Sequence, residues 1–232
     1  MRFAVQSDRI GERMKTRIPM LFIVAFLSAT SYAQTRVEIT LKNGSEAEIR
    51  TKEQLQGLLK TYDLSKWVFT KSVLIDEESI PHSHPVLTLN TRHLKDNELL
   101  LSTFVHEQLH RFFQQRKETD EAVKELRVLF PKVPVGFPDG AEDEYGTYVH
   151  LLVIFFEWRA DRDLFGELKA RQVMDFWATD HYRWVYKTVL ERPRDIWKII
   201  SKHKLIPPER LTTACARRPF SVPLMEVAPG RG

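Results

Sequence analysis

The stretch Phe104-Val105-His106-Glu107-Gln108-Leu109-His110-Arg111-Phe112-Phe113 contains the pattern His-Glu-x-x-His among apolar residues that recur at helical spacing. This spacing predicts a helix over 96–116. Positions four apart on a helix lie about 40° apart around the axis and about 6 Å apart along it, so His106 and His110 can direct two imidazoles at one metal ion. Glu107 lies about 100° round from His106, outside the set of ligands but within reach of a water molecule beside the metal.

The composition is that of a folded, globular chain. Of the 232 residues, 43% are hydrophobic and 28% are charged, which is typical of one domain with a substantial core. The net charge of +4 includes no dense block of Lys and Arg, which argues against a nucleic-acid partner. Because Cys215 is the single cysteine, no intrachain disulfide is possible, and core packing, with the help of any bound metal, must hold the fold.

The N-terminus has the features of a secretory signal peptide. Basic residues precede an apolar run over 20–27, and the small residues Ser31 and Ala33 follow at the spacing that a signal peptidase requires. We therefore expect a signal peptide over 1–33, with Met14 as the more ordinary start, and a secreted or periplasmic protein. The apolar run is too short for a comfortable membrane span, so we expect no stable span after cleavage.

The rest of the chain predicts an α+β domain over 34–208, followed by a loose tail over 209–232 that contains several Pro and Arg residues. The expected architecture is a small, mostly antiparallel N-terminal sheet packed on a bundle of helices. Alternating and apolar patterns predict strands at 36–41, 67–70, 72–75 and 86–90, with a hairpin return at 46–50. Helical patterns predict a short helix capped by Thr51, with Leu55, Leu58 and Leu59 on one face, and further helices at 96–116, 118–129, 144–168, 177–190 and 194–203.

A third metal ligand is expected on the helix over 144–168. The run Leu151–Phe156 is apolar on nearly all sides, so this helix is predicted to be buried. A carboxylate such as Glu157 is costly there unless it is paired or binds a metal. Asp161 lies one turn later on the same face, and His150 lies two turns earlier, so the three side chains share one stripe. A buried ion pair between Glu157 and a basic residue of another helix is the alternative.

Together, His106-Glu107-x-x-His110 and Glu157-x-x-Ala160-Asp161 resemble the motifs of the gluzincin metallopeptidases, and in size the chain is similar to the minigluzincins. The resemblance covers roughly residues 84–168. It implies a zincin-like fold and an exported zinc-dependent peptidase that hydrolyses peptide or protein substrates. It also implies one Zn²⁺ with His106, His110 and Glu157 as ligands, Glu107 as general base and Asp161 as the residue that supports a ligand.

Related patterns fit the sequence less well. Metzincins require Gly and His where this chain has Phe113 and Arg116. The segment over 140–146 is close to the aspzincin pattern but one residue short, which leaves Asp143 as a minor alternative ligand. His150 is a second alternative, because it shares the face of Glu157.

The remaining roles in catalysis stay open at this point. His150, Tyr148 and Tyr145 are candidate donors to the oxyanion, with His150 the first choice as a catalytic residue besides Glu107. The strand at 86–90 would, as in gluzincins, pair with an extended substrate. A non-catalytic metal-binding or interaction domain is the alternative function.

Overall fold

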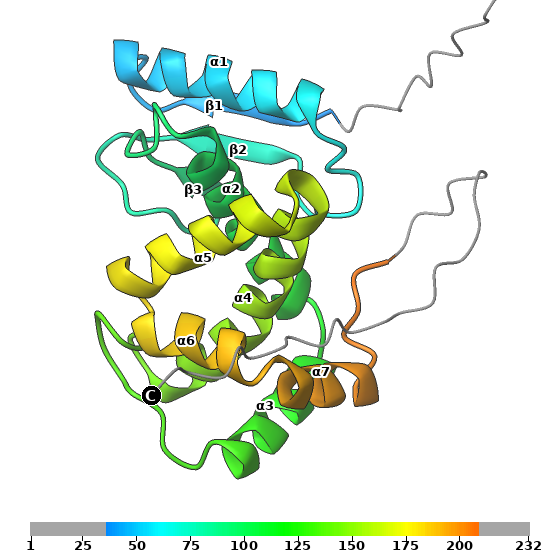
Figure 1. Ribbon diagram of the computed structural model, residues 1–232. Coiled ribbons are helices and arrows are strands. Elements are labelled where there is room, and N and C mark those ends of the chain that lie inside the picture. Colours follow the sequence, from blue (N-terminus) through cyan, green and yellow to red (C-terminus); the bar gives the residue numbers. More distant parts are fainter. Residues whose placement is uncertain (1–35, 209–232) are drawn as a thin grey trace, which may run out of the picture. The chain divides into compact units, whose positions relative to one another are not determined.

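The structure, a computed structural model, describes residues 36–208 (Figure 1). The predicted signal peptide, the predicted tail and Cys215 lie outside the described residues. The described part contains three strands and seven helices: β1 (Glu38–Leu41), α1 (Glu46–Thr61), β2 (Ser72–Ile75), β3 (Leu87–Leu89), α2 (Asn97–Gln114), α3 (Glu118–Leu129), α4 (Glu144–Phe165), α5 (Glu167–Asp180), α6 (Arg183–Glu191) and α7 (Pro193–Lys202).

The strands form one sheet in the order β1-β2-β3, and both pairings are parallel. The prediction of a mostly antiparallel sheet is therefore wrong, and the described chain is mainly helical. The reason lies in the connection between β1 and β2. Helix α1 packs on both strands and carries the chain back to the end where β1 began, so that β2 enters the sheet in the same direction (Figure 1).

Residues 46–50, expected to return as a hairpin strand, instead form the first turn of α1. Ser45 caps this helix, and its hydroxyl accepts a hydrogen bond from Glu48 N at 3.2 Å. The fully buried Glu48 side chain turns back and accepts from Asn43 N at 2.9 Å and from Gly44 N at 2.7 Å. This arrangement is a variant of the Ser-x-x-Glu capping box, which favours a helix over a strand at this point.

Replacing Glu48 by Ala should lower the free energy of unfolding by about 1–2 kcal/mol, because the backbone N–H groups of Asn43, Gly44 and Glu77 lose their charged acceptor. Burial raises the pKa of Glu48, but the N–H groups of Asn43, Gly44 and Glu77 outweigh this effect and the pKa is lowered. Glu48 should therefore stabilise the fold above the ordinary glutamate pKa and cease to do so as the pH falls through its lowered pKa.

Urea unfolding followed by circular dichroism, at neutral pH and at about pH 3, measures this difference. Glu46→Ala is the matched control, because Glu46 lies on the same helical turn with an 89% exposed side chain. The control should change stability little. Equal stability of the two variants at neutral pH would contradict the assignment.

Gln108, which lies between the two histidines of the motif, fixes α2 against the segment before β2. Its Oε1 accepts from Phe69 N and from Thr70 N, both at 2.7 Å, and its Nε2 donates to Thr70 O at 2.9 Å. Residues 67–70 are therefore an irregular segment held by a side chain and not the predicted strand. Because Gln108 is fully buried, these bonds also fix the rotation of the helix that carries the motif.

The outer edge of β3 is occupied by the segment that precedes it. His82 N donates to Thr88 O at 3.1 Å, and Thr88 N donates to His82 O at 2.8 Å, which forms an isolated antiparallel bridge. This bridge uses the two backbone groups with which Thr88 would bind an extended peptide. The backbone of Thr88 is therefore not free to pair with an extended substrate, as the strand predicted at 86–90 would require.

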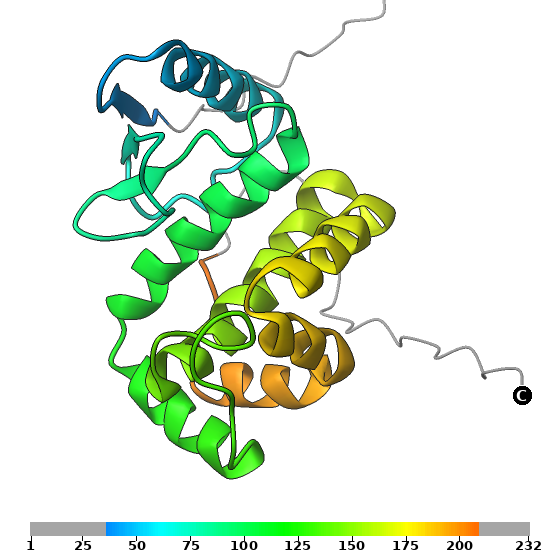
Figure 2. The same cartoon turned by 90° about the vertical axis from the view of Figure 1, so that its left-hand side faces the viewer.

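Helix α4 is the centre of the helical part, where it contacts α2, α3, α5, α6 and α7 (Figure 2). Its apolar run over 151–156 is buried, as its sequence indicates. The helix predicted over 177–190 is interrupted, because α5 ends at Asp180 and α6 begins at Arg183. Within residues 36–208, no helix has both the length and the apolar character needed to cross a membrane.

Candidate metal centre

Three histidines from two helices meet at one point. His106 and His110 project from α2 and His150 from α4, and one ring nitrogen of each lies within 4.8 Å of the others. Nε2 of His106 and Nε2 of His110 are 3.1 Å apart. Two nitrogens bound to one tetrahedral zinc at about 2.0–2.1 Å would lie about 3.3 Å apart, so the donor type and the spacing both fit one ion.

Hydrogen bonds at the opposite ring nitrogens orient two of these imidazoles. His150 Nδ1 lies 2.7 Å from Gly146 O, and His106 Nδ1 lies 2.8 Å from Glu157 Oε2. Both oxygens accept, so Nδ1 carries the proton in each ring and Nε2 keeps its lone pair in the neutral imidazole. Metal-binding histidines are commonly held in this way.

Burial also favours the neutral form of two of the three histidines. It lowers the pKa of His150 to about 3, with a smaller contribution from His106. It lowers the pKa of His110 well below the usual value, with contributions from His150 and His106. Burial acts in the same direction on His106, but Glu157 outweighs it and raises the pKa of that ring. Neutral His110 and His150 are in the protonation state that a metal ligand needs.

Glu157 lies behind the cluster and holds His106 from that side. Its Oε1 accepts from the Ser102 hydroxyl at 2.7 Å, and its two oxygens accept from the Tyr186 hydroxyl at 3.2 and 3.1 Å. The carboxylate, only 1% exposed, thus joins α4 to α2 and α6. The structure thus brings His150, and not Glu157, together with His106 and His110 in the group that could hold an ion. The buried partner of Glu157 is the histidine His106, where the ion-pair alternative expected a basic residue such as Arg or Lys.

The two other acidic residues singled out from the sequence also lie outside the His cluster. Asp161 is fully buried, and its Oδ2 lies 3.1 Å from the Ser102 hydroxyl oxygen. Burial, followed by the nearby Glu157, raises the pKa of Asp161 well above the usual value. Asp161 therefore supports Ser102, which donates to Glu157, and makes no hydrogen bond of its own to the three histidines. Asp143 caps α4, where its Oδ1 accepts from Gly146 N at 2.5 Å.

Glu107 is the carboxylate beside the cluster that remains available for proton transfer. It is 6% exposed, and burial raises its pKa to about 7 against the opposing effects of His106 and His82. In the hydrogen bonds among residues 36–208, its side chain has no partner. A carboxyl group whose pKa is near neutral can both accept and return a proton at neutral pH.

Tyr182 is the aromatic residue in contact with the cluster, and no sequence motif marks it. It forms the link between α5 and α6 in the left-handed backbone conformation, with φ 47° and ψ 36°. Its ring centroid lies 4.0 Å from that of His150, and its plane is within 5° of the His106 ring at 6.3 Å. Burial, followed by Glu107, raises its pKa to about 12, so the hydroxyl stays protonated.

The tyrosines selected from the sequence are engaged elsewhere. The Tyr148 hydroxyl donates to Phe130 O at 2.6 Å, and the Tyr145 hydroxyl donates to Asp120 Oδ1 at 2.7 Å. The Tyr182 hydroxyl, by contrast, makes no hydrogen bond within the part of the chain that the structure describes. Tyr182 is therefore better placed than either to donate to a bound substrate.

Comparison of the chain with protein-family models, with curated proteins and with solved structures finds no significant match.

Proposed function

We propose that this protein is a zinc-dependent peptidase whose ion is held by His106, His110 and His150. The observation that carries the proposal is the convergence of three histidine nitrogens within 4.8 Å, next to a buried glutamate. Three histidines and an open fourth position form one of the known ligand sets of catalytic zinc. The choice of peptides as substrates rests on the resemblance of the His-Glu-x-x-His motif to that of gluzincins.

A zinc ion held by these three histidines would lower the pKa of a bound water molecule and polarise the carbonyl group of a substrate. Glu107 takes the proton from the water as it attacks the carbonyl carbon, and delivers it to the nitrogen of the leaving amine. Tyr182 donates its hydroxyl hydrogen to the carbonyl oxygen as negative charge develops there. Glu157 accepts the proton of His106 Nδ1 throughout, which leaves the lone pair of Nε2 free to bind an ion.

A test combines metal analysis with an unbiased substrate screen. Protein purified without chelator is assayed for bound metals, then incubated with a diverse peptide library whose products are identified by mass spectrometry. We expect one zinc ion per chain, and cleavage that stops with a chelator and returns with zinc. Stoichiometric zinc without cleavage of any peptide would instead favour a non-catalytic metal-binding domain, and absence of any metal would overturn the proposal.

Tyr182→Phe should lower kcat by about a hundredfold, with little change in KM and in zinc content, because it removes one donor to the developing oxyanion. Tyr62→Phe is the matched control, since Tyr62 packs its half-buried ring against Phe165 at the end of α1. Steady-state kinetics on one peptide from the screen measures both variants. An unchanged kcat in Tyr182→Phe would remove Tyr182 from the mechanism.

A further inference from the structure

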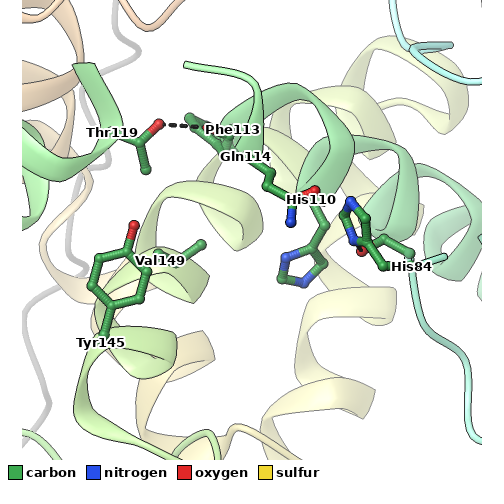
Figure 3. A pocket seen from close by; sticks show the side chains of 8 residues that line it. His84, His110, Phe113, Gln114, Thr119, Tyr145 and Val149 are labelled. Carbon is green, nitrogen blue, oxygen red and sulfur yellow. Dashed lines mark hydrogen bonds between the residues drawn. The ribbon is translucent and has the colours of Figure 1, made fainter. Parts of the chain in front are cut away.

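A pocket of about 170 Å³ opens beside the cluster, between the end of α2 and the beginnings of α3 and α4 (Figure 3). One of its walls is His110, so the pocket and the candidate metal centre share a side chain. Its lining consists of Ser83, His84, His110, Phe113, Gln114, Thr119, Tyr145 and Val149. A substrate group that enters this pocket would therefore be adjacent to a bond that reacts at the metal.

The hydroxyl groups of the lining are already used inside the protein. Thr119 Oγ1 donates to Phe113 O at 2.8 Å, and the Tyr145 hydroxyl donates to Asp120. Ser83 Oγ lies 2.6 Å from His84 Nδ1. The hydrogens of the Thr119 and Tyr145 hydroxyl groups are therefore not free for a substrate. The rings of Phe113 and Tyr145 and the methyl groups of Val149 offer apolar contact, while His84 Nε2 is buried without a hydrogen-bond partner.

The lining also lacks the charges that a charged group would need. Its eight residues include no Asp, Glu, Lys or Arg. A charged side chain placed here would lose its hydration without gaining a counter-ion, which is costly.

The volume limits the size of the occupant. A cavity of about 150 Å³ in a protein accommodates a benzene molecule. The pocket of about 170 Å³ therefore admits a side chain up to the size of a phenyl ring, such as that of Leu, Met or Phe, whereas an indole ring is too large.

We propose that this pocket is the specificity site of the enzyme and binds an uncharged side chain, no larger than a phenyl ring, from a substrate residue next to the scissile bond. The inference rests on the proposed peptidase function, because it concerns the same metal centre. It adds the substrate class that the metal centre alone does not define.

The test uses the full-length protein loaded with zinc and peptides that vary only at the two positions flanking the scissile bond. At one of these positions, kcat/KM should be about ten- to a hundredfold higher with Leu, Met or Phe than with Gly, from the burial of one apolar side chain. Asp, Lys and Trp at that position should be disfavoured to a similar extent.

A matched pair of variants locates this preference in the pocket. Gln114 lines the pocket at the end of α2, and Gln115, the next residue, is exposed and does not line it. Gln114→Trp should fill the space and remove the preference for Leu over Gly while peptides with Gly are still cleaved. Gln115→Trp should retain the wild-type preference.

The outcomes separate the two proposals. Cleavage with a flat preference at both positions, or an unchanged preference in Gln114→Trp with peptides still cleaved, overturns the pocket assignment and leaves the peptidase proposal standing. Absence of cleavage of every peptide by the zinc-loaded wild type overturns both. Should Gln114→Trp fail to fold, Val149→Phe fills the same pocket from α4, with the exposed Val128→Phe as its control.

Discussion

Glu107→Gln should lower kcat for peptide hydrolysis by about 10²- to 10⁴-fold while the protein retains one zinc ion per chain. General-base catalysis contributes about 10²- to 10⁴-fold, and the amide cannot take a proton. Glu107 is buried and does not belong to the cluster of His106, His110 and His150. Its replacement by an amide of the same shape therefore leaves the three nitrogen donors in place. Loss of turnover with retained metal is the pattern that distinguishes a base from a ligand.

The measurement pairs single-peptide kinetics with metal analysis of the same preparation. Glu78→Gln, a change at an exposed glutamate, should behave as the wild type. A Glu107→Gln variant that retains more than about a tenth of wild-type kcat would eliminate Glu107 as the base, even if the protein proves to be a peptidase.

His150→Ala should weaken zinc binding far more than Glu157→Gln does. Removal of His150 deletes one of the three nitrogens that meet at the centre. Glu157→Gln removes only the carboxylate that accepts from His106 Nδ1, a change that typically costs about 10- to 100-fold in metal affinity. Competition with a zinc chelator measures both affinities, and His203→Ala, at the end of α7, serves as the control that loses a histidine elsewhere.

If Glu157→Gln weakened zinc binding more than His150→Ala, the result would support Glu157 as a ligand, as the resemblance to gluzincins implies. A Glu157 variant that loses zinc while His150→Ala keeps it would make Glu157 the third ligand. Because Glu157 joins three helices, thermal unfolding of each variant should be recorded alongside, so that loss of metal is not confused with loss of the fold. Only variants that melt cooperatively enter the comparison.

The two histidines of α2 could be predicted from the sequence because their relation is local. A helix of 3.6 residues per turn places residues four apart on one face whatever surrounds it. The same rule predicted that His150, Glu157 and Asp161 lie on one stripe of α4. In the structure all three face α2, where His150 meets the histidine pair and the two carboxyl groups lie beside Ser102. The rule could not say which turn of that stripe lies level with the histidine pair, because His150 and Glu157 are about 10 Å apart along the axis and the offset between two helices is a tertiary property.

The direction of the sheet and the position of Tyr182 beside the His cluster could not be predicted, for different reasons. Ser45 and Glu48 form a capping-box pattern, which predicts the start of α1. The adjacent Asn43-Gly44 pair is a turn signal that predicts a hairpin, so the sequence supports two conflicting structures at this point. For Tyr182 there was no signal of this kind. The helical pattern continues from α5 into α6, and the break between them becomes visible only when both helices pack on α4.

The backbone of Tyr182 has a consequence for attempts to engineer this protein. The left-handed conformation costs a tyrosine about 1–2 kcal/mol relative to glycine, so a search for thermostable variants would select Gly or Asn at this position. Such a variant would give up the aromatic ring that covers His150 and the hydroxyl that it carries. At position 182, thermal stability should therefore favour Gly or Asn, whereas turnover should favour Tyr.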